Sequence, residues 1–76
     1  MKDFERLNAM VLTAHETGDV TTLVDVYHML GTQELRENKV DEGCFLLTQA
    51  YVYALESGDP RSGEIHQILK DHGREE

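Results

Sequence analysis

The stretch from Val40 to Leu55, VDEGCFLLTQAYVYAL, decides the fold of this chain. At the helical repeat of about 100° per residue, its apolar residues fill an arc of roughly 200°, about twice the width that a surface helix shows. A helix this apolar has to contact neighbours on several sides, so we expect the rest of the chain to pack around it. The arc comprises Val40, Gly43, Cys44, Leu46, Leu47, Ala50, Tyr51, Tyr53, Ala54 and Leu55.

The length and composition indicate a single small globular domain covering residues 1–76. The chain is 39% hydrophobic and 29% charged, so neither disorder nor a membrane protein is indicated. A core of this size supplies only about 3–5 kcal/mol, so a partner chain or a second copy would add useful stability.

Fifteen acidic residues against seven basic ones give the chain a formal net charge of −8. This charge repels phosphate backbones and anionic lipids, which excludes nucleic acid and membrane surfaces as expected partners. Two interpretations of the charge remain open. It serves solubility, or it attracts a basic partner protein.

A lone cysteine, Cys44, excludes an internal disulfide and a cysteine-based metal site within one chain. No apolar run approaches the roughly 18 residues of a membrane span. The first residues, MKDFERL, lack the basic and then apolar design of a signal peptide. We therefore expect a cytoplasmic protein.

Helical periodicity and helix-end signals predict an all-α chain with no strand. Apolar residues recur at helical spacing in the first segment, Gly18 is placed to end it, and Asp19 is placed to cap the next. Asn38 breaks the second segment, and Asp59 with Pro60 starts the last. The predicted helices are 3–17, 19–37, 39–57 and 60–72, and the face of the first comprises Phe4, Leu7, Met10, Val11 and Ala14.

An internal repeat relates residues 4–19 to residues 44–59. Both segments share A-x-E-[ST]-G-D, which closes one helix and caps the following one. A period near 40 residues with two helices per unit is typical of helical-hairpin arrays. The fold class predicted is therefore an antiparallel four-helix hairpin array.

The middle of the chain, about residues 24–57, resembles the tetratricopeptide repeat. Tyr27-x-x-Leu30-Gly31 is similar to the aromatic-x-x-Leu-Gly of that family, and Gly43, Leu47 and Ala50 fall where it places small, large and small residues. The resemblance implies one full hairpin between two half-units, binding of proteins or peptides, and no enzyme activity.

Two surfaces are candidate binding sites, and each has a simpler interpretation as ordinary solvated surface. The resemblance implies a polar groove lined by the first helix of each hairpin. Apolar residues in otherwise polar sectors of the second and third helices form the other candidate, unless the fourth helix or the N-terminus shields them. The groove comprises Asp25, His28, Thr32, Leu35, Arg36, Gln67, Lys70 and Arg74, and the apolar patch comprises Met29, Phe45 and Val52.

Metal binding and catalysis have no supporting motif in this sequence. The four histidines, at positions 15, 28, 66 and 72, form neither an i, i+4 pair nor an H-E-x-x-H motif. Neither a glycine-rich phosphate loop nor a nucleophile elbow is present. We predict no metal, no cofactor and no enzyme activity.

The sequence thus leads to two hypotheses from different classes. The first is a small interaction module that binds a protein segment or forms a homodimer. The alternative is an acidic inhibitor or mimic that neutralises a basic protein. Salt separates them, because binding through charge weakens steeply with ionic strength and apolar contact does not.

Overall fold

A computed structural model of the chain describes the backbone of residues 2–74 and the side chains of residues 5–74. This part of the chain forms four α-helices and no strand, which confirms the all-α prediction. The helices are α1 (Lys2–Thr17), α2 (Val20–Arg36), α3 (Val40–Ser57) and α4 (Arg61–Asp71), each end within one residue of its predicted place. The sequence places Phe4 on the apolar face of the first helix and predicts that residues 74–76 fray, but the Phe4 side chain and residues 75 and 76 lie outside the described part of the chain.

The first three helices end at residues that adopt a left-handed backbone conformation. Gly18 after α1 has φ +71°, and Gly58 after α3 has φ +67°. Asn38 ends the turn after α2 with φ +63°, a conformation that asparagine tolerates better than most residues. The three breaks in the helical pattern therefore follow from local backbone chemistry.

Acidic side chains satisfy free backbone donors where α2 and α4 begin. Asp19 accepts a hydrogen bond from the backbone N–H of Thr22 at 3.2 Å and another from the Thr22 hydroxyl at 2.6 Å. Asp59 accepts one from the backbone N–H of Arg61 at 2.9 Å. The repeated Gly-Asp dipeptide thus ends one helix and starts the next in both copies.

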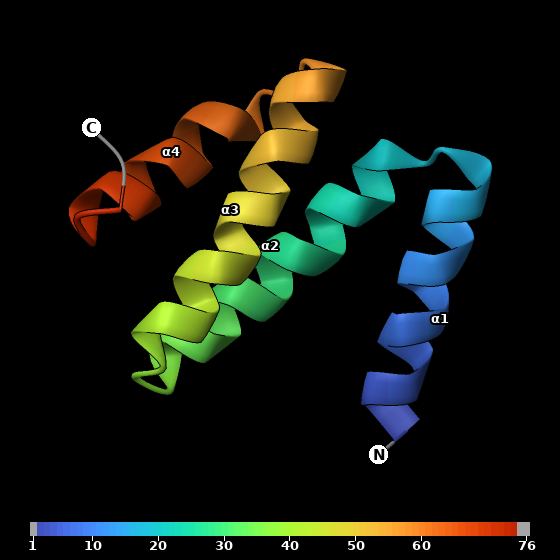
Figure 1. Cartoon of the computed structure of the whole chain (residues 1–76), viewed down its shortest axis with the longest axis horizontal. Helices are drawn as coiled ribbons and strands as arrows, with labels where there is room; N and C mark the ends of the chain where they lie inside the picture. Colours follow the sequence, from blue (N-terminus) through green and yellow to red (C-terminus); the bar gives the residue numbers. More distant parts are fainter. Residues whose placement is uncertain (1, 75–76) are drawn as a thin grey trace.

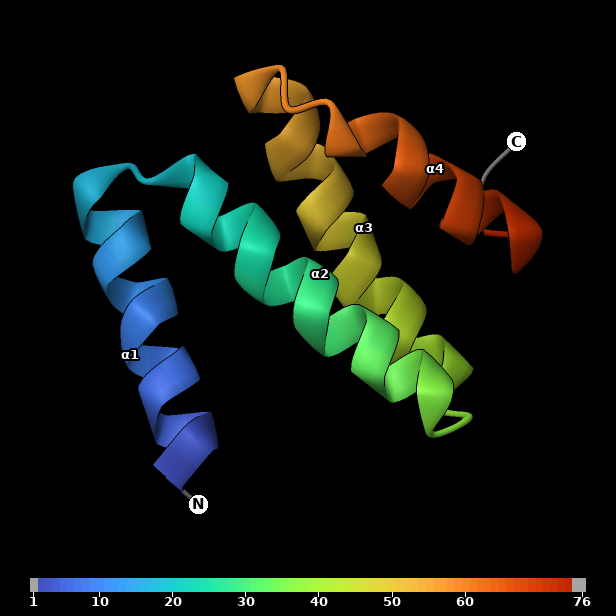
Figure 2. The same ribbon diagram turned by 180° about the vertical axis from the view of Figure 1, so that it is seen from behind.

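The helices form a flat molecule in which α2 and α3 lie side by side and α3 runs back along α2 (Figures 1 and 2). The Cα atoms extend over 32 × 30 × 13 Å. Helix α4 packs on α3, whereas α1 packs on α2 near their connecting turn and diverges from it toward the N-terminus. Helix α3 therefore contacts neighbours on two sides, as its wide apolar arc predicts.

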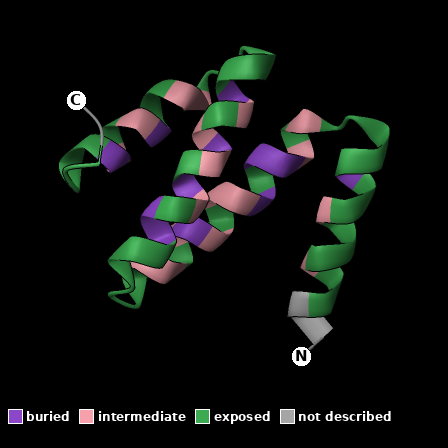
Figure 3. Cartoon of the chain, in the orientation of Figure 1, coloured by how far each residue is buried: buried purple, intermediate pink, exposed green. Residues whose placement is uncertain are grey.

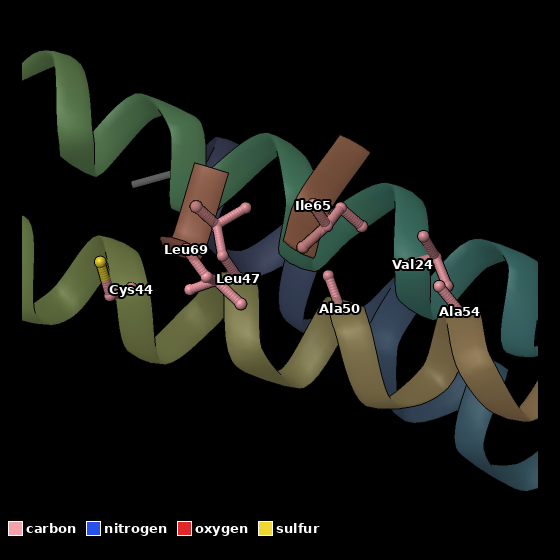
Figure 4. Close-up of a cluster of buried hydrophobic side chains, with 7 residues drawn as sticks. All are labelled: Val24, Cys44, Leu47, Ala50, Ala54, Ile65 and Leu69. Carbon is pink, nitrogen blue, oxygen red and sulfur yellow. The ribbon is translucent and has the colours of Figure 1, made fainter. Parts of the chain in front are cut away.

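The core lies where α2, α3 and α4 meet. Fully buried side chains of α3 alternate with those contributed by the helices on either side, and burial is sparse on α1 (Figures 3 and 4). No polar or charged side chain is buried among the described residues. The central cluster comprises Val24, Cys44, Leu47, Ala50, Ala54, Ile65 and Leu69.

Several residues differ from the faces that periodicity predicts. Val26 is buried with 2% of its surface exposed, although it lies outside the apolar face that the sequence predicts for α2, which comprises Val20, Leu23, Val24, Tyr27, Leu30, Gly31 and Leu35. Met10, Val40 and Leu55, which the sequence places on apolar faces, are 41%, 36% and 56% exposed. In each case the burial depends on where a neighbouring helix lies, which the periodicity of one helix does not contain.

Aromatic contacts join each of the other three helices to α3. Tyr53 stacks on Tyr27 of α2, with ring centroids 6.0 Å apart, and meets the ring of His15 edge-on at 5.9 Å. Tyr51 contacts His66 of α4 at 5.5 Å. These contacts give the tyrosines of α3 a structural role, and they add a packing partner for His15 at the end of α1.

Candidate functional site

Two residues of the predicted groove, Asp25 and His28, face side chains of α4. The guanidinium of Arg61 donates a hydrogen bond to the Asp25 carboxylate. The Nε2 atom of His28 is inaccessible to solvent and lies 3.5 Å from the Glu64 carboxylate, without a hydrogen bond to any described residue. This part of the groove is therefore spanned by contacts between α2 and α4.

Three of the remaining groove residues, Thr32, Gln67 and Arg74, have hydrogen-bond partners within the chain. The Thr32 hydroxyl donates to backbone carbonyls of its own helix at 3.0 Å, and the Gln67 amide donates to Asp71 at 2.8 Å. Arg74 pairs at 2.5 Å with Asp41, at the start of α3. Leu35 is half-buried against the core, and Arg36 and Lys70 are exposed.

The strongest electrostatic feature is the arginine that joins α4 to the turn before it and to α2. Arg61 donates from Nε and from Nη2 to the two oxygens of Asp59, at 3.0 and 2.7 Å. These hydrogen bonds, together with that from the Arg61 backbone N–H, lower the pKa of Asp59 to about 2. The Asp59 side chain is only 11% exposed, so the pair has a structural role.

The predicted apolar patch is exposed. Phe45 and Val52 of α3 are 64% and 43% exposed, and neither α4 nor the described part of α1 covers them. Met29 is 43% exposed but lies on α2. The structure therefore places two of the three patch residues on one helix, seven residues apart.

Leu55 extends this exposed surface, and it was missing from the predicted patch. It lies three residues beyond Val52, so Phe45, Val52 and Leu55 follow the spacing of a helix face. We call these three residues the α3 stripe. The i, i+7, i+10 spacing was the available signal, but Leu55 lies at the edge of the apolar arc and was assigned to the buried side.

Surface hollows lie on two sides of Phe45. The larger, of about 500 Å³, is lined mainly by apolar atoms of Phe45 and Leu46 and of three acidic residues, Glu34, Asp41 and Glu42. The second, of about 380 Å³, has a more polar lining: Asp41, Cys44, Phe45, Thr48 and Arg74. The Phe45 ring is thus a projecting apolar group with space around it for side chains of another molecule.

Another hollow follows α1. It has a volume of about 410 Å³, and residues from one side of α1, including Met10 and Ala14, line it together with Asp19 and Thr22. A smaller cleft of about 140 Å³ between α1 and α2 is lined by Leu7, Asn8, Val11, Tyr27 and Leu30. Neither hollow was predicted from the sequence.

Within the described part of the chain, no group of three or more histidine, cysteine, aspartate or glutamate side chains is arranged to hold a metal ion. None of the helices within residues 2–74 combines the length and apolarity that a membrane crossing needs.

Comparison of the chain with protein-family models, with curated proteins and with solved structures gives no match.

Proposed function

We propose that this chain is a small protein–protein interaction module without catalytic activity, and that the α3 stripe is its binding surface. The observation that carries the proposal is the exposure of Phe45, which at 64% is the most exposed of the large apolar side chains that the structure describes. Leaving a phenylalanine and two aliphatic side chains in water on one helix face has a cost, which contact with another protein removes.

The packing around α3 supports this choice over the predicted groove. Leu47 and Ala50 are fully buried between α2 and α4, so the helix is fixed on its inner side. A rigid helix presents side chains to a partner at a lower entropic cost than a loop does. In the groove, by contrast, Asp25 and His28 already have neighbours on α4.

We also propose that the helices are arranged as a tetratricopeptide-like array. Support comes from the small residues Gly31 and Gly43, at a close approach of α2 and α3. Further support comes from the internal repeat, in which Met10 and Ala14 of α1 correspond to Ala50 and Ala54 of α3. Ala14 and Ala54 are both buried, at 2% and 0% exposed, whereas Met10 is 41% exposed where Ala50 is fully buried.

A second function is favoured by the charge, namely neutralisation of a basic protein. The net charge of −8 supports it, and so do the acidic residues around Phe45. In either role a cytoplasmic location suits a chain whose lone thiol, Cys44, is buried and unpaired.

Site-specific photo-crosslinking in the source cells tests the interaction role. A benzophenone side chain is introduced at position 45, and in a matched control at position 12 of α1, where Leu12 is 54% exposed. We expect one defined adduct from position 45, identified by mass spectrometry, and none from position 12. Binding of the purified partner should then be lost in Phe45→Ser. Equal adducts from both positions, or none from position 45, would contradict the proposal.

A salt titration with the purified partner separates the two functions. Charge neutralisation predicts that affinity falls steeply between low and moderate ionic strength, because the Debye length shrinks to about 10 Å at 0.1 M salt. Docking on the α3 stripe predicts that most of the affinity survives the same change.

A further inference from the structure

The α3 stripe has the shape of a docking site for a helix. Phe45 and Leu55 are ten residues apart, which is about 15 Å along a helix at 1.5 Å per residue. Thr48 lies between them on the same face, and its hydroxyl already donates to the Cys44 carbonyl at 2.8 Å. The α3 stripe is therefore suited to apolar contact with a partner. Another helix presents apolar side chains at a matching i, i+3, i+7 spacing.

The charge around the stripe decides what kind of helix fits. Helix α3 contains Asp41, Glu42 and Glu56 and no lysine, arginine or histidine. Glu42 and Glu56 form no ion pair within the described part of the chain, and Glu42 lines the larger hollow beside Phe45. These carboxylates are available to a cationic partner.

Nearby basic side chains reduce this negative charge only in part. Arg74 pairs with Asp41, and the amine of Lys39 lies 3.9 Å from Glu34 and 3.6 Å from Glu37. Lys39 therefore divides its charge between two carboxylates. The uncompensated negative charge is greatest at Glu42, beside the larger hollow next to Phe45.

From these observations we infer that the α3 stripe binds an amphipathic helix of another protein whose apolar face is flanked by arginine or lysine. The inference rests on the proposed function and specifies its partner. The aliphatic part of an arginine fits over Phe45 and Leu46 in the larger hollow, with its guanidinium at Glu42. A guanidinium at this place also gains from the face of the Phe45 ring.

The same charges argue against a second copy of this chain as the occupant. In either packing direction, Glu42 and Glu56 would meet no lysine, arginine or histidine on the second α3. Packed antiparallel, the two helices would bring Glu42 toward Glu56, which opposes like charges at the edge of an apolar contact. The whole chains also repel each other, because each carries a net charge of −8.

Synthetic helical peptides test the partner class on the ¹⁵N-labelled full chain by NMR titration. The probe is an amphipathic peptide of about 20 residues with leucine on one face and arginine beside it. Its comparisons are a neutral glutamine version, a glutamate version and an arginine peptide of scrambled order. We expect the arginine amphipath to shift the amides of residues 41–56, and to bind about tenfold or more tightly than the neutral version.

Matched variants locate the binding. Replacing Phe45, Val52 and Leu55 together by serine should abolish binding, whereas serine at Met10 and Leu12 of α1 should leave it unchanged. Glu42→Gln with Glu56→Gln should weaken the arginine peptide several-fold and leave the neutral peptide unaffected. Circular dichroism of each variant establishes that its helices are intact.

Other outcomes have definite meanings. Equal binding of the neutral and arginine peptides at α3 overturns the basic partner but keeps the interaction role. Absence of peptide binding at α3, with crosslinks formed from position 45, overturns the helical partner alone. Binding of the scrambled peptide as tightly as the amphipath shows unspecific charge attraction and overturns the inference. A dimer in light scattering that the triple variant dissolves assigns the stripe to a second copy.

Discussion

Gly31 of α2 and Gly43 of α3 face each other at a close approach of the two helices. A Cβ atom on Gly31 would lie 2.6 Å from Cγ of Leu47 and 3.0 Å from the carbonyl oxygen of Gly43. A Cβ atom on Gly43 would lie 2.8 Å from Leu35 and 2.9 Å from the carbonyl oxygen of Gly31. Each glycine thus leaves room for the backbone of the other helix, and the pair allows α2 and α3 to pack closely.

Gly31→Ala should therefore destabilise the fold although alanine favours helices. The new methyl group meets backbone and the branch point of a fully buried leucine, and overpacking of this kind costs about 1–3 kcal/mol. We expect a lower urea midpoint in circular dichroism. For a domain holding only about 3–5 kcal/mol, the loss is a large fraction of the total stability.

Gly63→Ala is the matched control for this substitution. Gly63 lies within α4, and a Cβ atom there meets nothing within 4 Å. Helix propensity then acts alone and should stabilise the chain, by at most about 1 kcal/mol. If both alanine variants were stabilised, the close approach of α2 and α3 would be refuted.

Replacing Tyr53 and replacing Tyr51 should each destabilise a different helix, α1 and α4 respectively. Tyr53 contacts His15 of α1, whereas Tyr51 contacts His66 of α4. Aromatic contacts contribute about 0.5–1.5 kcal/mol beyond their buried area, so losing one should speed local amide exchange about two- to tenfold. Hydrogen exchange should show faster α1 amides in Tyr53→Ala and faster α4 amides in Tyr51→Ala. The same pattern in both variants would contradict these assignments.

The helices could be predicted closely because the signals that end them are local. Gly18, Asn38 and Asp19 act on backbone groups within a few residues of themselves, so their effect is visible in the sequence. The contact between Arg61 and Asp25 joins residues 36 positions apart. No periodicity contains that pairing, and for this reason the groove between α2 and α4 was predicted without the contacts that span it.

The candidate site was predicted in part for the same physical reason. Phe45 and Val52 lie in the polar sector of α3, so the sequence marks them as candidates but leaves open whether the fourth helix or the N-terminus shields them. Leu55 lies at the edge of the apolar arc, where its exposure depends on how far α4 extends across α3. Two residues of the exposed face could therefore be named from the sequence, whereas their exposure and the extent of the face require the packed structure.

Asp59→Asn should remove a pH-dependent part of the stability. The pKa of Asp59 is lowered from an ordinary 3.8 to about 2 by its hydrogen bonds with Arg61. The folded state therefore binds the proton more weakly than the unfolded state. This stabilisation is complete above pH 4 and is lost as the pH falls through about 2.

The measurement is urea unfolding of wild type and Asp59→Asn across this pH range. The difference in stability between them should be largest near neutral pH and should shrink toward pH 2. In an Arg61→Gln background the same comparison should depend much less on pH, because the main cause of the shift is gone. An unchanged pH dependence in that background would assign the effect to other groups.

The two faces of α3 should respond oppositely to truncation, which separates its binding role from its structural role. Leu47 is fully buried, so Leu47→Ala removes packed methyl groups and leaves a cavity, at a cost of about 2–5 kcal/mol. That cost is comparable to the whole stability of a domain of this size. Circular dichroism of the Leu47→Ala variant should therefore show an unfolded population at 25 °C. Phe45 is exposed on the opposite face, so Phe45→Ser should change the stability by no more than about 0.5 kcal/mol. A large destabilisation by Phe45→Ser would mean that the ring supports the fold. That result would contradict the proposal that the α3 stripe is a binding surface.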